Sequence, residues 1–280
     1  PKPGETLLGG EFVQVAGGKG ANQAVAAARL GAEVSFVARV GQDALGHQAI
    51  ENFKADGIIT DFIGQDSERP SGVALIMVDN AGENMIAVAS GANAELSPLQ
   101  VDGARGAFQE AAVLLLQLET PLVTVSHAAR LARQAGMKVI LNPAPACELD
   151  DALLQNVSII TPNETETEIL TGILPENEAA AKAAGKALRK RGVETAVITM
   201  GEKGAYISSP KVEGMVAALS VTAVDTTAAG DAFNGALACA MASGYQLEEA
   251  VKFSNRVAAF SVTRLGAQPS LPTRQDLDHG

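Results

Sequence analysis

The sequence from Asp225 to Ala236 reads DTTAAGDAFNGA and separates two different patterns. Residues 220–224 before it favour a strand, and the alanine-rich run after it favours a helix. The free amides and the dipole of a helix N-terminus attract anions such as phosphate, and Gly230 gives the turn conformational freedom. Asp231 is then either a helix cap or a base that takes a proton from an attacking hydroxyl beside a phosphate.

Helix and strand patterns alternate along the rest of the chain from about residue 20. We expect helices over residues 20–30, 45–56, 121–134, 164–170, 177–191 and 247–263, and strands over residues 34–40, 112–116, 138–141, 158–160 and 195–199. This alternation predicts a single α/β domain over residues 1–280, with a mostly parallel sheet covered by helices on both faces.

Two stretches break the alternation, at about residues 5–15 and 72–90. Both favour strands, and the second has a hairpin-like turn at residues 79–82. We expect them to form a small extra sheet. Such a sheet is either a lid that excludes water from a site or a plain antiparallel extension.

The composition excludes several classes of function. Hydrophobic residues make up 47% of the 280 residues and charged residues 19%, so the chain is not disordered as a whole. A net charge of −11 disfavours binding to nucleic acid or to anionic lipid. The apolar run 236–242 is too short to cross a membrane, and no signal peptide pattern is visible, so we expect a cytoplasmic protein. Cys147 and Cys239 stand apart and predict neither a disulfide framework nor a zinc site.

A second glycine-rich segment, GGKGANQ at residues 17–23, also precedes a predicted helix. Its spacing fits neither the phosphate loop GxxxxGK[ST] nor the dinucleotide motif GxGxxG. It is either a tight turn with a solvated lysine or a polyol or anion pocket that uses Asn22 and backbone amides. Glu119 ends an apolar strand segment, and open α/β sheets bind ligands at the carboxyl ends of their strands.

Two further segments have both a structural and a functional interpretation. In TPNETE, residues 161–166, Asn163 and Glu166 have the spacing of a helix capping box, or they face phosphates through Mg²⁺. In TMGEKG, residues 199–204, the glycines either border a flat ring or a phosphate, or make a hairpin. Spacing alone does not choose between these interpretations.

Taken together, these motifs resemble the two signatures of the ribokinase-like (pfkB) carbohydrate kinase family. The signatures are residues 17–22 continuing to Gly31 and Gly41, and residues 225–238, and the resemblance runs from PGET at 3–6 to GAQPS at 266–270. Residues 142–146 (NPAPA) and 163–166 also look like family sequence. The resemblance implies a three-layer α/β/α fold with a small β lid, and ATP-dependent phosphorylation of the 5-hydroxyl of D-ribose.

The resemblance also implies roles for individual residues. Asp231 matches the general base, and the amides of Ala228, Ala229 and Gly230 match the anion hole. The sugar positions match Gly18, Lys19, Gly20, Asn22, Glu119 and Asp231. The ATP positions match Asn163, Thr199, Gly201, Lys203, Gly204, Gly230 and Asn255.

Cofactors and partners are implied in the same way. Glu166 matches the carboxylate tied to Mg²⁺ and phosphate. Family members also bind a monovalent cation, usually K⁺, and the matching positions are Asp225, Thr227, Ser261, Arg264, Gly266 and Ser270. The lid usually forms the dimer contact as well, so we expect a homodimer. In the family, a strand with an Asn-x-Asp sugar clamp precedes the PGET segment, and we expect the natural protein to carry it, because a lost central strand would expose unpaired backbone groups.

Other functions remain to be weighed. Relatives phosphorylate deoxyribose, other sugars or nucleosides, but a nucleoside needs an apolar or aromatic wall, and the chain has eight Phe, two Tyr and no Trp. A catalytically silent sugar sensor has no need for a base beside an anion hole. A dehydrogenase is disfavoured because no GxGxxG follows a strand with an acidic residue at the required spacing.

Overall fold

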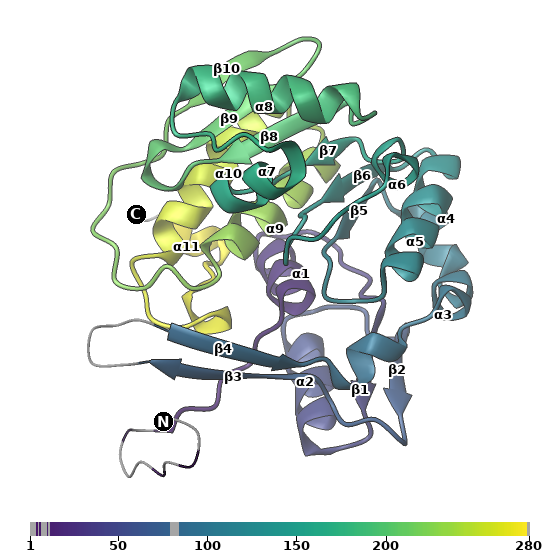
Figure 1. The fold of residues 1–280 in the computed structure, drawn as a ribbon. Coiled ribbons are helices and arrows are strands. Elements are labelled where there is room, and N and C mark those ends of the chain that lie inside the picture. Colours follow the sequence, from purple (N-terminus) through teal and green to yellow (C-terminus); the bar gives the residue numbers. More distant parts are fainter. Residues whose placement is uncertain (1–3, 5, 7–9, 11, 79–83, 279–280) are drawn as a thin grey trace.

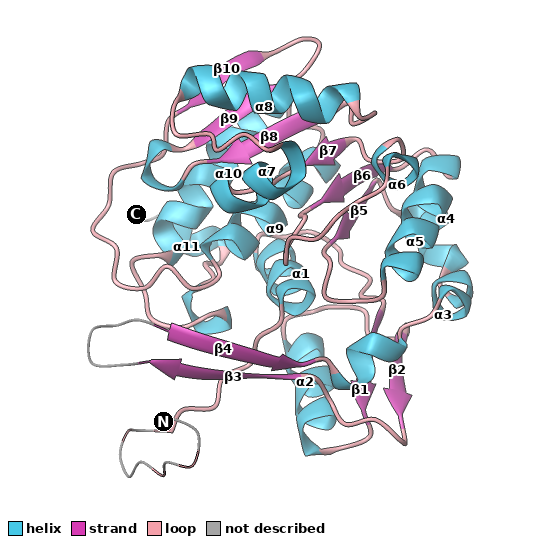
Figure 2. Ribbon diagram, in the orientation of Figure 1, coloured by secondary structure: helices cyan, strands magenta, loops and turns pink. Residues whose placement is uncertain are grey.

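The computed structural model describes residues 4, 6, 10, 12–78 and 84–278. Its main sheet contains, in order, β10 (Glu213–Val216), β9 (Ala205–Ser208), β8 (Thr195–Thr199), β7 (Ile159–Ile160), β6 (Lys138–Leu141) and β5 (Val113–Leu116). Strands β5 to β8 are parallel, while β9 and β10 are each antiparallel to the preceding strand (Figure 2). The strands expected over residues 112–116, 138–141, 158–160 and 195–199 are confirmed.

Helices cover both faces of this sheet, which confirms the predicted α/β layers (Figure 1). One face packs on α5 (Leu122–Gln134), α6 (Asp151–Leu154), α7 (Glu164–Thr171) and α8 (Glu178–Lys190), and the other on α9 (Ala229–Ala242) and α10 (Leu247–Ser261). Successive side chains of β6 point to opposite faces of the sheet, because side chains alternate along a strand. Val139 and Leu141 join the first cluster, and Ile140 joins the second.

The N-terminal part of the described chain adds a smaller parallel unit. It consists of α1 (Lys19–Arg29), β1 (Ala38–Gly41), α2 (Ala44–Ala55) and β2 (Ile63–Asp66), with β1 parallel to β2. The strand expected over residues 34–40 is shorter and shifted, because only Ser35 makes an isolated bridge before Ala38. Short helices α3 (Pro98–Gly103), α4 (Arg105–Glu110) and α11 (Arg274–Asp278) complete the described α-helices, and three 3-10 helices cover Gly91–Glu95, Gly201–Lys203 and Gln268–Ser270.

The extra sheet is an antiparallel hairpin of β3 (Val73–Val78) and β4 (Asn84–Ala89), which projects from the body (Figure 1). The turn predicted at 79–82 lies outside the described residues. The strand expected over 5–15 is wrong for its described part: residues 12–15 form no strand and find no pairing partner there, and Phe12 is 87% exposed.

The strand expected over residues 220–224 is also wrong. This segment is exposed loop, and the Val224 amide donates to the Val262 carbonyl at the end of α10. Its backbone is therefore bound to a helix end instead of a neighbouring strand. Among the described residues, no helix is long and apolar enough to cross a membrane.

Candidate active site

The site is built where the first turns of α1 and α9 meet. Gly18, with φ of 96°, precedes α1, and Ala228, with φ of 60°, precedes α9. The two helices approach closely because Gly235 has no side chain: a Cβ there would lie 2.5 Å from the Cβ of Ala26. Small residues in the second signature therefore place one helix N-terminus against the other.

Asp231 is the buried acid at this junction, with 7% of its surface exposed. Both of its carboxylate oxygens accept hydrogen bonds from α1: Oδ2 from Asn22 Nδ2 at 2.8 Å and Oδ1 from Gln23 Nε2 at 2.9 Å. Burial raises the pKa of Asp231, and these hydrogen bonds and nearby Lys19 oppose the increase. The helix-cap interpretation of Asp231 is wrong, because the cap position is Ala228, which makes no side-chain cap bond.

The other predicted sugar positions surround the start of α1. The Lys19 amide donates to Glu119 Oε2 at 2.8 Å, and a Cβ on Gly18 would lie 4.0 Å from the same oxygen. Asn22 Oδ1 is buried and has no hydrogen-bond partner within the described part of the chain. A buried acceptor without a partner is costly, so a donor from a ligand is favoured at this position.

One of the three amides of the predicted anion hole already has a hydrogen-bond partner within the chain. The Ala229 amide donates to the Thr226 carbonyl at 3.2 Å, which closes the turn before α9. A Cβ on Gly230 would meet nothing within 4 Å, so this residue faces open space at the helix N-terminus. A phosphoryl group therefore has room to approach the first turn of α9, where the helix dipole attracts negative charge.

The expected nucleotide positions form two groups. In the first, Asn163 and Glu166 make the predicted capping box, with hydrogen bonds of 2.8 and 2.9 Å, and the Thr199 amide donates to the neighbouring Pro162 carbonyl. Burial raises the pKa of Glu166 most, and the charges of Lys19 and Asp231 also act on it. The start of α7 therefore lies within electrostatic reach of Asp231.

The second group lies at the end of β10. Asn255 donates to the Val216 carbonyl at 2.9 Å, and a Cβ on Gly204 would lie 2.1 Å from that same oxygen. Gly201, with φ of 53°, begins the short 3-10 turn after β8, and Lys203 Nζ donates to the Glu176 carbonyl at 2.9 Å. The Asn255 side chain thus holds the end of β10 in place, and the Lys203 side chain ties the turn after β8 to the segment before α8.

Three of the expected K⁺ positions, Asp225, Thr227 and Gly266, lie together. The Asp225 carboxylate accepts from the amides of Thr227 at 2.9 Å and Gly266 at 2.8 Å, which joins two segments 41 residues apart. Burial raises the pKa of Asp225, but the hydrogen bonds from Thr227 and Gly266 outweigh it, so the pKa is lowered.

Three other expected K⁺ positions use their side chains locally. The hydroxyls of Ser261 and Ser270 donate to carbonyls three residues earlier, and the Arg264 guanidinium contacts Asp276 at 3.1 Å. The Arg264 side chain is a cation and has no acceptor, so only its backbone oxygen is a suitable ligand, whereas the two serine hydroxyl oxygens keep their lone pairs. Nowhere in the described ranges do three His, Cys, Asp or Glu side chains gather to hold a metal ion.

Sequence reasoning missed a set of buried and half-buried amides and hydroxyls behind Asp231. Gln117, Asn142 and Thr161 follow β5, β6 and β7, and they connect to Gln23 of α1 and Asn234 of α9. Polar residues just after parallel strands are the signal that could have revealed them, since those strand ends share one edge.

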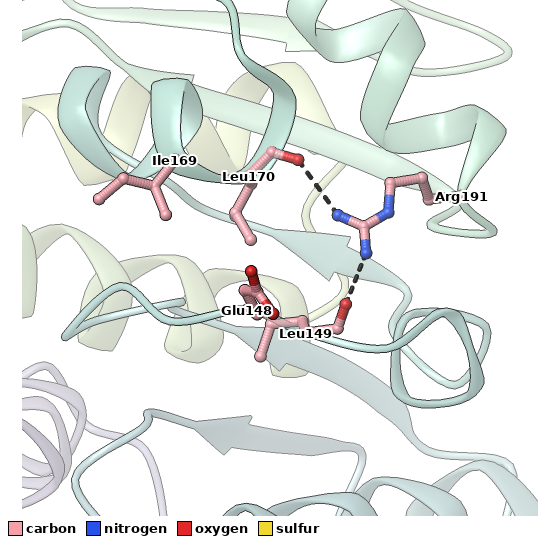
Figure 3. A pocket seen from close by; sticks show the side chains of 5 residues that line it. All are labelled: Glu148, Leu149, Ile169, Leu170 and Arg191. Carbon is pink, nitrogen blue, oxygen red and sulfur yellow. Dashed lines mark hydrogen bonds between the residues drawn. The ribbon is translucent and has the colours of Figure 1, made fainter.

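A hollow of about 260 Å³ lies elsewhere, lined by Glu148, Leu149, Ile169, Leu170 and Arg191 (Figure 3). The Arg191 guanidinium donates to the carbonyls of Leu149 and Leu170, at 2.5 and 3.1 Å. These bonds tie together the ends of separate elements. The hollow contains none of the predicted site residues.

Comparison with known proteins matches residues 1–274 to the model of the pfkB family of carbohydrate kinases. A ribokinase of Haemophilus influenzae is 46% identical over 275 residues, covering 98% of this chain and 90% of that protein. A deoxyribokinase of Salmonella typhi is 42% identical over 274 residues, covering 98% of this chain and 90% of that protein. The structure of an Arabidopsis thaliana ribokinase complexed with ribose and ATP matches with a TM-score of 0.93 and 32% identity, covering 100% of this chain and 91% of that one.

Proposed function

The chain belongs to the pfkB family of carbohydrate kinases, and from this membership we propose that it transfers the γ-phosphoryl group of ATP to the 5-hydroxyl of D-ribose. It is an ATP-dependent sugar phosphotransferase. The observation that carries the proposal is the buried Asp231 carboxylate at the N-terminus of α9, within hydrogen-bond distance of Asn22.

The sugar is held at the start of α1. Glu119 and the Lys19 amide are already paired, and Asn22 Oδ1 is the buried acceptor without a described partner. A sugar hydroxyl that donates to this oxygen removes the cost of leaving it unpaired. Glu119, the Lys19 amide and Asn22 form hydrogen bonds, which a polyhydroxylated substrate requires. They orient the reacting hydroxyl toward Asp231.

Phosphoryl transfer then needs a base and a positive field. Asp231 accepts the proton of the sugar 5-hydroxyl while the hydroxyl oxygen forms a bond to the γ-phosphorus. The bond from that phosphorus to the β–γ bridging oxygen breaks, which releases ADP. The open first turn of α9 at Gly230 stabilises the charge that develops on the transferred group. The start of α7, the end of β8 and the edge at Val216 bind the nucleotide.

Two cations fit the residues present. Glu166, a buried carboxylate near the charges of Lys19 and Asp231, would hold Mg²⁺ through water, since this ion retains waters and prefers few carboxylates. Asp225, Thr227 and Gly266, joined by hydrogen bonds, would hold K⁺ together with backbone oxygens of Ser261, Arg264 and Ser270. When bound, Mg²⁺ neutralises phosphate charge and K⁺ orders the loop before α9.

A second candidate substrate is 2-deoxyribose, because a deoxyribokinase is 42% identical to the chain. We measure ADP release by the full-length protein with Mg-ATP and K⁺, in separate reactions with ribose, 2-deoxyribose, fructose and adenosine. Ribose as the best substrate by kcat/KM supports the proposal. Preference for 2-deoxyribose assigns the second candidate, and ADP release with none of the four favours a silent sugar-binding protein.

We further propose that residues 1–280 act as one kinase domain whose β3–β4 hairpin is a lid and a homodimer contact. The family match over residues 1–274 supports the single domain. Leu75, Met85 and Val88 of the hairpin are each 60% or more exposed, at 64%, 60% and 64%, which supports a covering partner. Analytical ultracentrifugation tests the dimer directly.

A further inference from the structure

Gln23 is fully buried on α1, next to Asn22, and all its polar hydrogens have acceptors. Its Nε2 donates to Asp231 Oδ1 at 2.9 Å and to Asn142 Oδ1 at 3.0 Å, while its Oε1 accepts from Gln117 Nε2 at 2.6 Å. A fully paired amide inside a protein has one favoured orientation, since turning it over would face donors to donors.

The orientation of the Gln23 amide is set by the Thr161 carbonyl, to which it is connected by two successive hydrogen bonds through Asn142. Asn142 Nδ2 donates to the Thr161 carbonyl at 3.3 Å, and a carbonyl can only accept. Asn142 must therefore turn its Oδ1 toward Gln23, and Gln23 must turn its Nε2 toward Asn142 and Asp231. The direction of hydrogen bonding is thus transmitted from the end of β7 to the Asp231 carboxylate.

A second branch from Thr161 reaches the other side of Asp231. The Thr161 hydroxyl donates to Asn234 Oδ1 at 2.6 Å, and Asn234 Nδ2 donates to the Gly230 carbonyl at 2.8 Å. Thr161 is 1% exposed and Asn234 2%, so water does not compete for these bonds. The two branches hold the side chain of Asp231 and the peptide before it against the same strand end.

We propose that Gln23 is a positioning residue for the phosphoryl transfer, which presents an N–H to Asp231 and keeps its carboxylate a hydrogen-bond acceptor, with Asn142 acting only through Gln23. This inference rests on the proposed function, because it takes Asp231 as the base. The other charges that act on Asp231 are Lys19 of α1 and Glu166 of α7, and neither changes in the variants below.

The first test removes the donor. Gln23→Met keeps the length of the side chain without its N–H, and Gln23→Glu places a carboxylate against Asp231. We expect the acid limb of the kcat profile to move to higher pH by about one to two units in Gln23→Met, the size expected of a hydrogen bond to a charged group, and at least as far in Gln23→Glu. The KM for sugar stays unchanged because Asn22, Lys19 and Glu119 remain. An acid limb at the wild-type pH in both variants overturns the proposal.

The second test is a double-mutant cycle. Asn142→Ala removes no direct contact of Asp231, so any effect of this variant on the acid limb must pass through Gln23. We expect Gln23→Met with Asn142→Ala to equal Gln23→Met alone, and independent, additive shifts would contradict the transmission. Thr124→Val is the control: it removes a buried hydrogen bond to the Leu96 carbonyl, away from Asp231, and leaves the pH profile unchanged.

A third measurement does not depend on turnover. The ¹³C NMR titration of the Asp231 carboxyl in the substrate-free protein reports its pKa in each variant, assigned by loss of the signal in Asp231→Asn. A higher pKa in Gln23→Met supports the proposal, and an unchanged pKa overturns it. Wild-type protein without kinase activity would instead reject the proposed function, while this titration still decides whether Gln23 lowers the pKa of Asp231.

Discussion

Asn22 Nδ2 lies 2.8 Å from Asp231 Oδ2, although 209 residues separate the two in the sequence. One belongs to the first glycine-rich segment and the other to the second, so this hydrogen bond joins the two motifs into one site. The opposite end of the same amide, Asn22 Oδ1, is buried and lacks a partner among the described residues. A single side chain thus orients the base and offers an acceptor to the substrate.

Replacing Asp231 by Asn removes the base without changing the shape of the side chain. We expect kcat to fall by at least roughly 10²-fold, as for the loss of a general base, with sugar and ATP binding largely retained. In the wild type, kcat falls as pH decreases through the pKa of Asp231, which burial raises above 3.8. Turnover near the wild-type rate, measured by ADP release, would contradict the assignment.

Asp231→Asn, which lowers kcat, is expected to raise the stability of the folded protein at neutral pH. Because the pKa of Asp231 is raised on folding, the native state binds more protons than the unfolded state, and stability falls as pH rises through the folded pKa. Ionised Asp231 is therefore destabilising at neutral pH, and Asp231→Asn is more stable than the wild type there. Asn22 accommodates the new amide by turning over, so that its Oδ1 accepts from that amide and its Nδ2 faces the sugar, whose hydroxyl accepts as well as donates. Urea unfolding at pH 7 and pH 4 measures the difference in unfolding free energy between Asp231→Asn and the wild type. A difference that is as large at pH 4 as at pH 7 would refute the prediction.

Ala228 holds a left-handed conformation, with φ of 60°, directly before α9. This conformation costs an L-residue about 1–2 kcal/mol, whereas glycine adopts it freely and loses about 0.5–1 kcal/mol in chain entropy. We expect Ala228→Gly to be as stable as the wild type or more so, and Ala228→Val to be less stable. Ala229→Gly is the matched control at the first helical residue, which lowers the unfolding free energy by about 0.4–1 kcal/mol through the entropy of the unfolded chain. Equal losses for both glycine variants in thermal unfolding would disprove the argument.

Asp225 is the test of the proposed K⁺ site. Asp225→Ala removes the acceptor for the amides of Thr227 and Gly266, which hold the loop before α9. We expect activity to fall and to lose its response to K⁺, while in the wild type a much larger organic cation in place of K⁺ reduces activity. Asp102→Ala, at an exposed surface pair with Arg105, is the control and keeps the response to K⁺. Equal activity of the wild type in every cation would remove the site.

The lid hairpin is the test of the proposed dimer. Leu75→Asp and Val88→Asp place charges on exposed apolar positions of β3 and β4, where burial against a partner would be costly. We expect either variant to sediment as a monomer at concentrations where the wild type is a dimer. Leu99→Asp changes an apolar residue of α3 outside the hairpin, 79% exposed, and keeps the dimer. A wild type that is monomeric throughout would rule out this contact.

Several elements could be predicted because their causes are local. The helices at Lys19–Arg29 and Glu178–Lys190 begin and end within two residues of expectation, since periodic apolar positions and flanking glycine or asparagine specify them. The parallel strands β5 to β8 are apolar because both sheet faces are buried. Residues 220–224 have the same β-favouring side chains, but a strand also needs a neighbour with free backbone groups, which composition does not encode.

The amino-acid sequence alone determined the α/β class, the family and the presence of Asp231 at a helix start, because periodicity and contiguous motifs carry that information. Only the tertiary structure decided that Asp231 is not a cap, that Asn22 and Gln23 occupy both of its oxygens, and that Asn142 and Thr161 stand behind them. Those contacts join residues from α1, α9 and three strand ends. Hydrogen-bond direction between side chains depends on distances across the fold, and no spacing along the chain reports them.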